Sequence, residues 1–143
     1  MRVLGLDIGE TRVGVAVSDP LGIIASPLAV LDARGLMRDP TPLARLAEDY
    51  EVECLVVGLP LTLAGDEGPQ AAEIRTRAER LGAKLGLAVE YHDERLSTAE
   101  ARKRMREAGL SDKDQRGLLD KVAAAIVLQR WLDARRVQPR EDA

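Results

Sequence analysis

The chain has 143 residues, a formal net charge of −3 and one cysteine. A domain of this length buries about 70% of the surface that its unfolded chain exposes and needs no covalent staple. The single Cys54 excludes a disulfide framework and a cysteine metal cluster, and is expected to be a buried, inert thiol. With no Phe, two Tyr and one Trp, the composition argues against an aromatic platform for stacking bases, and the acidic balance argues against an overall basic coat.

The sequence is expected to be cytoplasmic and to have no membrane partner. No apolar stretch reaches the length that crosses a bilayer, and MRVLGLDIG begins directly with a strand pattern instead of a secretory leader.

Residues 3–19 predict two strands joined by a tight turn. Apolar and small residues alternate in VLGLDIG and again in RVGVAVS, so each strand has one apolar face and one face of small residues. Asp7 lies on the small-residue face, which leaves room for a close approach. Because an unpaired buried charge is costly, Asp7 needs a partner elsewhere in the chain.

The segments after this hairpin predict alternating strands and helices. A third strand at 23–31 ends in a polar, glycine-containing loop at 32–39, and Pro42 opens an amphipathic helix. The run CLVVGL at 54–59 is typical of a central strand buried on both faces. A helix at 69–85 is closed by Gly86, and LAVEYH at 87–92 forms a fifth strand.

Two more helices complete the prediction. Ser97 and Glu100 form a capping box that opens a helix at 97–108, and a polar loop at 109–116 leads to a last helix at 118–135. The fold class is therefore α/β, with a five-stranded mixed sheet made of an antiparallel three-strand meander plus two parallel strands, and with flanking helices. Residues 1–136 are expected to form a single domain, and 137–143 a frayed tail.

Three carboxylates are predicted to converge at one edge of this sheet. Alanines on the last helix can pack on the small-residue face of the hairpin, which brings Asp120 toward Asp7, while Glu94 follows the fifth strand. Such a cluster requires a cation or a shared proton, and hard oxygen ligands favour Mg²⁺ or Mn²⁺. Two such ions can activate water and stabilise the leaving oxygen in phosphodiester cleavage. Taken singly, Asp120 could instead serve the helix dipole, and Glu94 could be an ordinary loop residue.

Other polar residues have structural interpretations. A basic run on one predicted helix is typical of a solvated face: Arg102, Lys103, Arg104 and Arg106. His92, at a strand end, is expected to be structural, and Trp131 is expected to lie in the core.

Four segments in this order and spacing resemble the YqgF (RuvX) family: LGLDIGETRVGVAVSD, VVGLP followed by GDEGPQA, HDERLSTAEA, and the DxxAAxIxL run at Asp120. The similarity covers nearly the whole chain. It implies an RNase H-like fold related to RuvC-type Holliday junction resolvases, and a metal-dependent nuclease that matures the small-subunit rRNA precursor. By motif, Asp7, Glu94 and Asp120 match the acidic catalytic and metal-ligating positions, and Arg12 and Arg95 match basic positions that suggest phosphate contacts.

The expected protein is thus an endonuclease with two Mg²⁺ or Mn²⁺ ions that acts on precursor rRNA or branched DNA. The sequence leaves both a monomer and a homodimer open. Two alternatives stay open. The DIGET run also suits the phosphate-cradling hairpin of the sugar kinase, actin and Hsp70 group, although the chain is too short for the two lobes that such proteins use. The second alternative is a non-catalytic module that binds RNA or a protein partner in the same groove.

Overall fold

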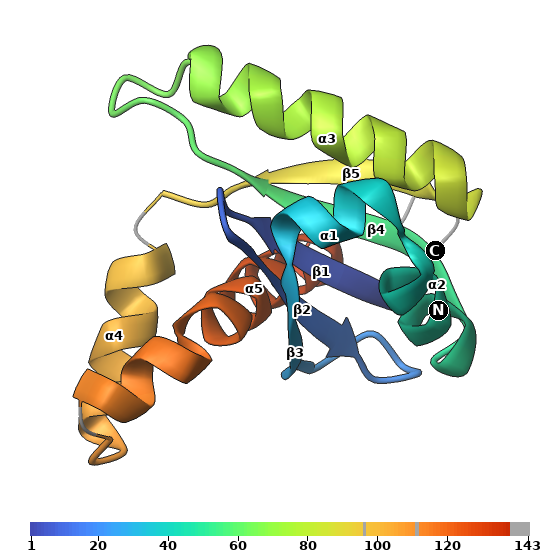
Figure 1. The fold of residues 1–143 in the computed structure, drawn as a ribbon. Helices are drawn as coiled ribbons and strands as arrows, with labels where there is room; N and C mark the ends of the chain where they lie inside the picture. The colour runs from blue at the N-terminus through green and yellow to red at the C-terminus, as the bar shows by residue number, and fades with distance from the viewer. Residues whose placement is uncertain (96, 111, 138–143) are drawn as a thin grey trace.

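A computed structural model describes residues 1–95, 97–110 and 112–137, which form one five-stranded sheet flanked by helices (Figure 1). The strand order is β3-β2-β1-β4-β5, with antiparallel pairs β1–β2 and β2–β3 and parallel pairs β1–β4 and β4–β5. This confirms the predicted fold class. The elements are β1 Arg2–Ile8, β2 Arg12–Ser18, β3 Ala25–Asp32, α1 Ala33–Arg38, α2 Thr41–Asp49, β4 Val52–Leu59, α3 Pro69–Leu85, β5 Ala88–Asp93, α4 Ser97–Glu107 and α5 Asp112–Val137.

The two faces of the hairpin β1–β2 pack into two different apolar cores. Its apolar face enters the larger core, beneath α1, α2 and α3, with Leu4, Leu6 and Val15 fully buried. Its small-residue face receives α5, and Val3 and Ala16 pack there against Ala124 in a second core. The sheet therefore separates two apolar layers, as the alternation in the sequence predicted.

Small residues on the hairpin are required by the approach of α5. A Cβ added to Gly14 would lie 2.1 Å from the backbone oxygen of Asp120, and one added to Gly5 would lie 2.8 Å from the Cβ of Leu128. No side chain fits at either position without moving the helix. The glycines thus fix how closely α5, and the carboxylate that it carries, can approach β1.

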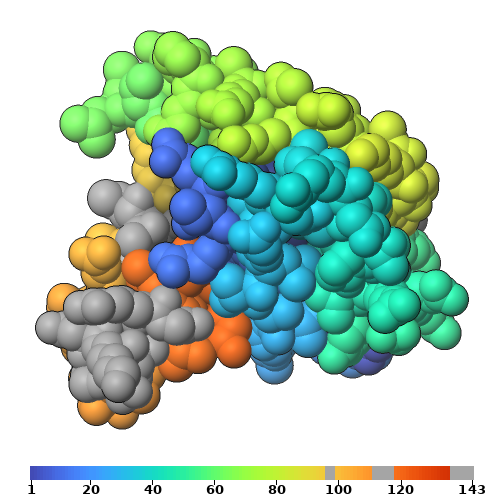
Figure 2. Space-filling model, viewed as in Figure 1, coloured from blue at the N-terminus to red at the C-terminus, as the bar shows by residue number. Residues whose placement is uncertain are grey.

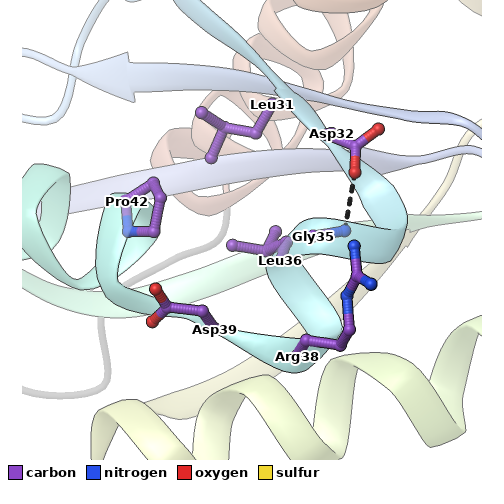
Figure 3. Close-up of a pocket in the computed structure, with 7 residues that line it drawn as sticks. All are labelled: Leu31, Asp32, Gly35, Leu36, Arg38, Asp39 and Pro42. Atoms are coloured by element: carbon purple, nitrogen blue, oxygen red, sulfur yellow. Dashed lines mark hydrogen bonds between the residues drawn. The ribbon is translucent and has the colours of Figure 1, made fainter.

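Two predicted loops are wrong. Residues 33–38 form the short helix α1, because Asp32 caps it by accepting a hydrogen bond from the Gly35 amide at 2.6 Å and because Leu36 is buried (Figure 3). The helix α5 begins at Asp112, within the loop predicted at 109–116. Its first turns lack apolar periodicity in the sequence, but they continue a helix whose later residues, such as Ala124 and Leu128, are buried.

The remaining boundaries agree with prediction to within a few residues, and α3 matches it at both ends. Of the predicted tail, Val137 ends α5, and 138–143 lie outside the described residues. The side chain of Ser97, and with it the predicted capping box, also lies outside the description. Within the part of the chain that the structure describes, no helix combines the length and apolar character needed to cross a membrane.

Candidate active site

The three predicted carboxylates come from three different elements that meet at one sheet edge. Asp7 is the second-last residue of β1, Glu94 directly follows β5, and Asp120 lies on α5. Because β1, β4 and β5 run parallel, their carboxyl ends share this edge. The Glu94 amide donates to the Leu59 carbonyl at 3.0 Å, which ties the exit of β5 to the end of β4.

A glycine on β4 makes room for the Glu94 side chain. A Cβ added to Gly58 would lie 2.6 Å from Glu94 Oε2 and 2.9 Å from Glu94 Cβ. The carboxyl group therefore lies directly over the backbone of the central strand. This is a cradle that only glycine supplies.

Asp7 and Glu94 are hydrogen-bonded to each other and share a proton. Burial, followed by the charge of Asp7, raises the pKa of Glu94 to about 9. Burial also raises the pKa of Asp7; the hydrogen bond from Glu94 opposes this rise, and the charge of Asp120 adds to it. Glu94 is thus the protonated partner at neutral pH, and its hydroxyl donates to Asp7.

Asp120 lies close enough to act on Asp7 electrostatically, but its carboxylate is paired with Arg12. The Arg12 Nε, at the start of β2, donates to Asp120 Oδ2 on α5 at 2.8 Å. The Arg12 side chain is 56% exposed and that of Asp120 23%. An ion pair this exposed contributes little to stability, so either group can exchange its partner for a ligand at small cost.

The chemistry of these side chains fits a hard divalent cation, because all three are carboxylates and two of them must give up a shared proton to be fully charged. In the structure, these carboxyl groups are instead paired with protein groups: Asp7 with Glu94, and Asp120 with Arg12. Among the described residues, no group of three or more His, Cys, Asp or Glu side chains is positioned to hold a metal ion. A cation would have to replace both the shared proton and the Arg12 guanidinium.

The second predicted phosphate contact, Arg95, is engaged elsewhere. Its backbone amide and Nε donate to the Asp93 carboxylate at 2.9 and 2.7 Å. Its Nη1 donates to the carbonyl oxygens of Thr62 and Leu63, at 3.4 and 3.2 Å. Arg95 thus ties the exit of β5 to the loop that follows β4.

Two arginines that the sequence did not single out for this site also hold its backbone. Arg130 on α5 donates to the Arg95 carbonyl at 3.3 Å and pairs with Glu100 on α4. Arg77 on α3 donates to the Gly9 carbonyl at 3.1 Å, in the turn that follows Asp7. Charged residues on helices have no sequence signal that separates such contacts from a solvated face.

The other polar predictions can be placed as well. Trp131 is buried in the second core, and Cys54 is a buried thiol whose pKa burial raises to about 11. His92 is partly buried, and burial lowers its pKa, so the ring stays neutral. The basic residues of α4 are exposed, and Arg104 pairs with Glu100 on the same helix.

Sequence relatives cover nearly the whole chain. A candidate pre-16S rRNA nuclease of Anaeromyxobacter dehalogenans (strain 2CP-C) is 49% identical over 135 residues, which cover 94% of this chain and 98% of the relative. Relatives of the same name from Thermosynechococcus vestitus and Moorella thermoacetica are 44% and 46% identical and cover 94% and 93% of this chain, and 89% and 95% of their own.

Solved structures share the fold at low sequence identity. T. thermophilus RuvC in complex with a Holliday junction substrate is 18% identical, with a TM-score of 0.57 and 96% of each chain covered. The Fowlpox virus resolvase in complex with Holliday junction DNA is 12% identical, with a TM-score of 0.61 and coverage of 96% of this chain and 100% of the resolvase. These likenesses confirm the predicted RNase H-like architecture.

The model of one family, described as Holliday junction resolvase, matches residues 1–134. This match and the close relatives agree with the four motifs found in the sequence, and the chain belongs to the RuvX family.

Proposed function

We propose that this chain is a nuclease that hydrolyses phosphodiester bonds in the precursor of 16S rRNA, with Asp7, Glu94 and Asp120 as its catalytic centre. The observation that carries the proposal is the convergence of these three carboxylates, from β1, the exit of β5 and α5, in a member of the RuvX family. The names of the close relatives support the RNA substrate. Branched DNA is the second substrate class, because the structural neighbours were solved with Holliday junctions.

The three carboxylates would hold two Mg²⁺ or Mn²⁺ ions, which when bound supply the positive charge that polarises the phosphodiester and stabilises the leaving oxygen. The remaining roles belong to the chain's own residues. Glu94 gives up the proton that it shares with Asp7, so the site gains charge as it loads. Arg12, once separated from Asp120, offers an exposed guanidinium to a phosphate beside the cluster.

Arg95 is proposed as a weaker substrate contact. Its guanidinium already serves Asp93 and two loop carbonyls, so only the N–H groups left over can reach a phosphate. We further propose that residues 1–136 act as one nuclease domain in the cytoplasm. A monomer suits a single RNA strand, and a homodimer suits a two-fold junction.

The test is cleavage of a 16S rRNA precursor fragment and of a four-way DNA junction, with Mg²⁺ or Mn²⁺ added. Asp7→Asn, Glu94→Gln and Asp120→Asn are each expected to reduce the cleavage rate by about 100-fold or more, because each removes a charge from the cation site. Asp49→Asn is the matched control. It removes an exposed carboxylate from α2, next to the start of β4 and thus at the opposite end of the parallel strands, and should cleave at the wild-type rate.

Cleavage by Asp7→Asn at the wild-type rate would overturn the proposed centre. Failure of the wild type to cleave either substrate with either metal would overturn the nuclease activity. If RNA still bound under those conditions, independently of metal and of Glu94, a non-catalytic RNA-binding module would be the better description.

A further inference from the structure

A cluster of arginines around a largely apolar hollow lies across the hairpin turn from the carboxylates. Residues 9–11 form this turn between β1 and β2, and on the side away from α5 it borders a surface hollow of about 280 Å³. Figure 2 shows the turn in blue, with α1 in cyan beside it and α3 in yellow-green above. The hollow is lined by Glu10, Ala33, Arg34, Met37, Arg38 and Arg77.

The charge of this hollow is positive. Three arginines and one glutamate line it, and its floor is formed by buried Ala33 and partly buried Met37. Arg34 and Arg38 are exposed and lie four residues apart on α1, so they share one helix face. No carboxylate among the described residues forms a salt bridge with either of them.

Arg77 connects this hollow to the candidate active site. Its Nη1 donates to the Gly9 carbonyl at 3.1 Å and its Nη2 pairs with Glu73 at 3.0 Å, which leaves further N–H donors of the guanidinium unused. Asp7 and Glu10 are three residues apart, so their Cα atoms are separated by at most about 11 Å. At about 3.4 Å per nucleotide along a strand, this upper limit corresponds to at most about three nucleotides between Asp7 and the turn that borders the hollow.

The opposite side of α1 is a poorer place for phosphate. A hollow of about 360 Å³ there contains Asp32 and Asp39, together with Arg38, which lines both hollows (Figure 3). Both carboxylates accept local hydrogen bonds: Asp32 from the Gly35 amide, and Asp39 from the backbone and side chain of Thr41. The negatively charged backbone of a nucleic acid is therefore attracted toward Arg34 and Arg77 and repelled by Asp32 and Asp39.

We propose that Arg34, Arg38 and Arg77 form a second backbone-binding site, which holds the phosphates of the substrate strand a few nucleotides from the scissile bond. This inference rests on the proposed function, since it takes the strand to be the one cleaved at Asp7. The arginine guanidinium groups donate hydrogen bonds to the phosphates. The apolar side chains of Ala33 and Met37 accommodate a ribose or the edge of a base. Glu10 opposes binding and limits the affinity.

The experiment measures equilibrium binding by fluorescence anisotropy, with Ca²⁺ in place of Mg²⁺, for a long RNA with about ten nucleotides on each side of the cleavage site. Arg34→Gln/Arg38→Gln is expected to weaken binding by about tenfold and to reduce the slope of log K against log salt by about 1.4, the value for two single-strand phosphate contacts. Glu10→Gln is expected to tighten binding, an effect that damage to the fold would not produce.

Two comparisons isolate the site. Arg45→Gln/Arg135→Gln removes two charges that do not line the hollow, and should retain the wild-type affinity and slope. An RNA shortened to about two nucleotides on the side that reaches α1 should bind the Arg34/Arg38 variant as well as it binds wild type. Both ends are shortened in turn, because either could lie on that side.

Equal affinity of wild type and Arg34→Gln/Arg38→Gln for the long RNA would overturn the inference while leaving cleavage, and hence the proposed function, intact. An equal loss of affinity for the long RNA and for both shortened RNAs would also overturn it, because the effect would then be a general one of net charge. If the variant bound RNA normally but lost affinity for a polyglutamate peptide, the hollow would be assigned to an acidic protein partner and not to nucleic acid.

Discussion

Glu94 carries the largest electrostatic cost among the three carboxylates when it ionises. Its carboxyl group lies against Gly58 and beside Asp7, where burial and a neighbouring negative charge both disfavour ionisation. An isolated glutamate in an unfolded chain has no such neighbours. The protonation of this one residue therefore couples the stability of the protein to pH.

We expect the metal-free protein to lose stability as pH rises from about 4.5 to about 9, the interval between the ordinary and the folded-state pKa of Glu94. In this interval the unfolded chain has released the Glu94 proton while the folded chain retains it, so the free energy of unfolding falls with pH. Glu94→Gln should flatten the curve and be more stable than wild type at pH 8. The measurement is urea unfolding in EDTA at a series of pH values.

Asp49→Asn is the matched control and should retain the wild-type slope, because its carboxylate is exposed on α2. Parallel curves for Glu94→Gln and wild type would show that Glu94 does not hold its proton in the folded protein. Asp7 has a raised pKa as well and contributes to the wild-type slope with the same sign.

At the scale of elements, the contact between the β1–β2 hairpin and α5 sets the position of Asp120. At Gly14 there is no space for a side chain, because an added Cβ would lie 2.1 Å from a backbone oxygen of the helix. A flexible side chain could turn away, but a helix backbone can relieve the overlap only by moving as a unit. A methyl group at this position should therefore displace the carboxylate.

Gly14→Ala is expected to lower the free energy of unfolding by about 1–3 kcal/mol and to reduce cleavage further than that loss explains, because Asp120 moves away from Asp7. Chemical denaturation and single-turnover cleavage measure the two effects. Gly68→Ala is the control, since its added Cβ would lie 3.6 Å from the nearest atom, Thr62 Cγ2. Wild-type cleavage by a folded Gly14→Ala protein would show that the hairpin does not position the helix.

How much of this was predictable differs between elements. The hairpin, β4 and α3 have strong periodicity and clear terminal signals, and the sequence located them. The helix α1 has six residues including Gly35 and is too short for a periodic pattern. The Asp32 cap that begins it is a local contact, but the burial of Leu36 depends on tertiary packing. The acidic positions followed from the motifs and packing pattern, whereas the Asp120–Arg12 pair depends on a contact between residues 108 positions apart.

At the scale of the whole molecule, the layers differ in how firmly they are held. The larger core beneath α1, α2 and α3 and the second core under α5 both enclose the central strands. The helix α4 packs on α5 through a small third cluster that includes Ala101, Ala123 and Ile126. Figure 1 shows α4 and the first half of α5 extending away from the sheet. Fewer buried apolar contacts mean a lower free energy of local opening.

We therefore expect backbone amides of α4 to exchange hydrogen for deuterium earlier than those of β1 and β4 in the metal-free protein. The connections of α4 lead to Glu94 on one side and, through α5, to Asp120 on the other, while Arg130 ties α4 to the Arg95 carbonyl. A cation bound by Glu94 and Asp120 would restrict the motion of the two segments that connect α4 to β5 and to the rest of α5. Added Mn²⁺ should thus slow exchange in α4 more than in β4, as measured by mass spectrometry of peptides, and should not do so in Asp7→Asn. Exchange in α4 as slow as that in β1 without metal would contradict this, because α4 would then open only with the global unfolding of the sheet.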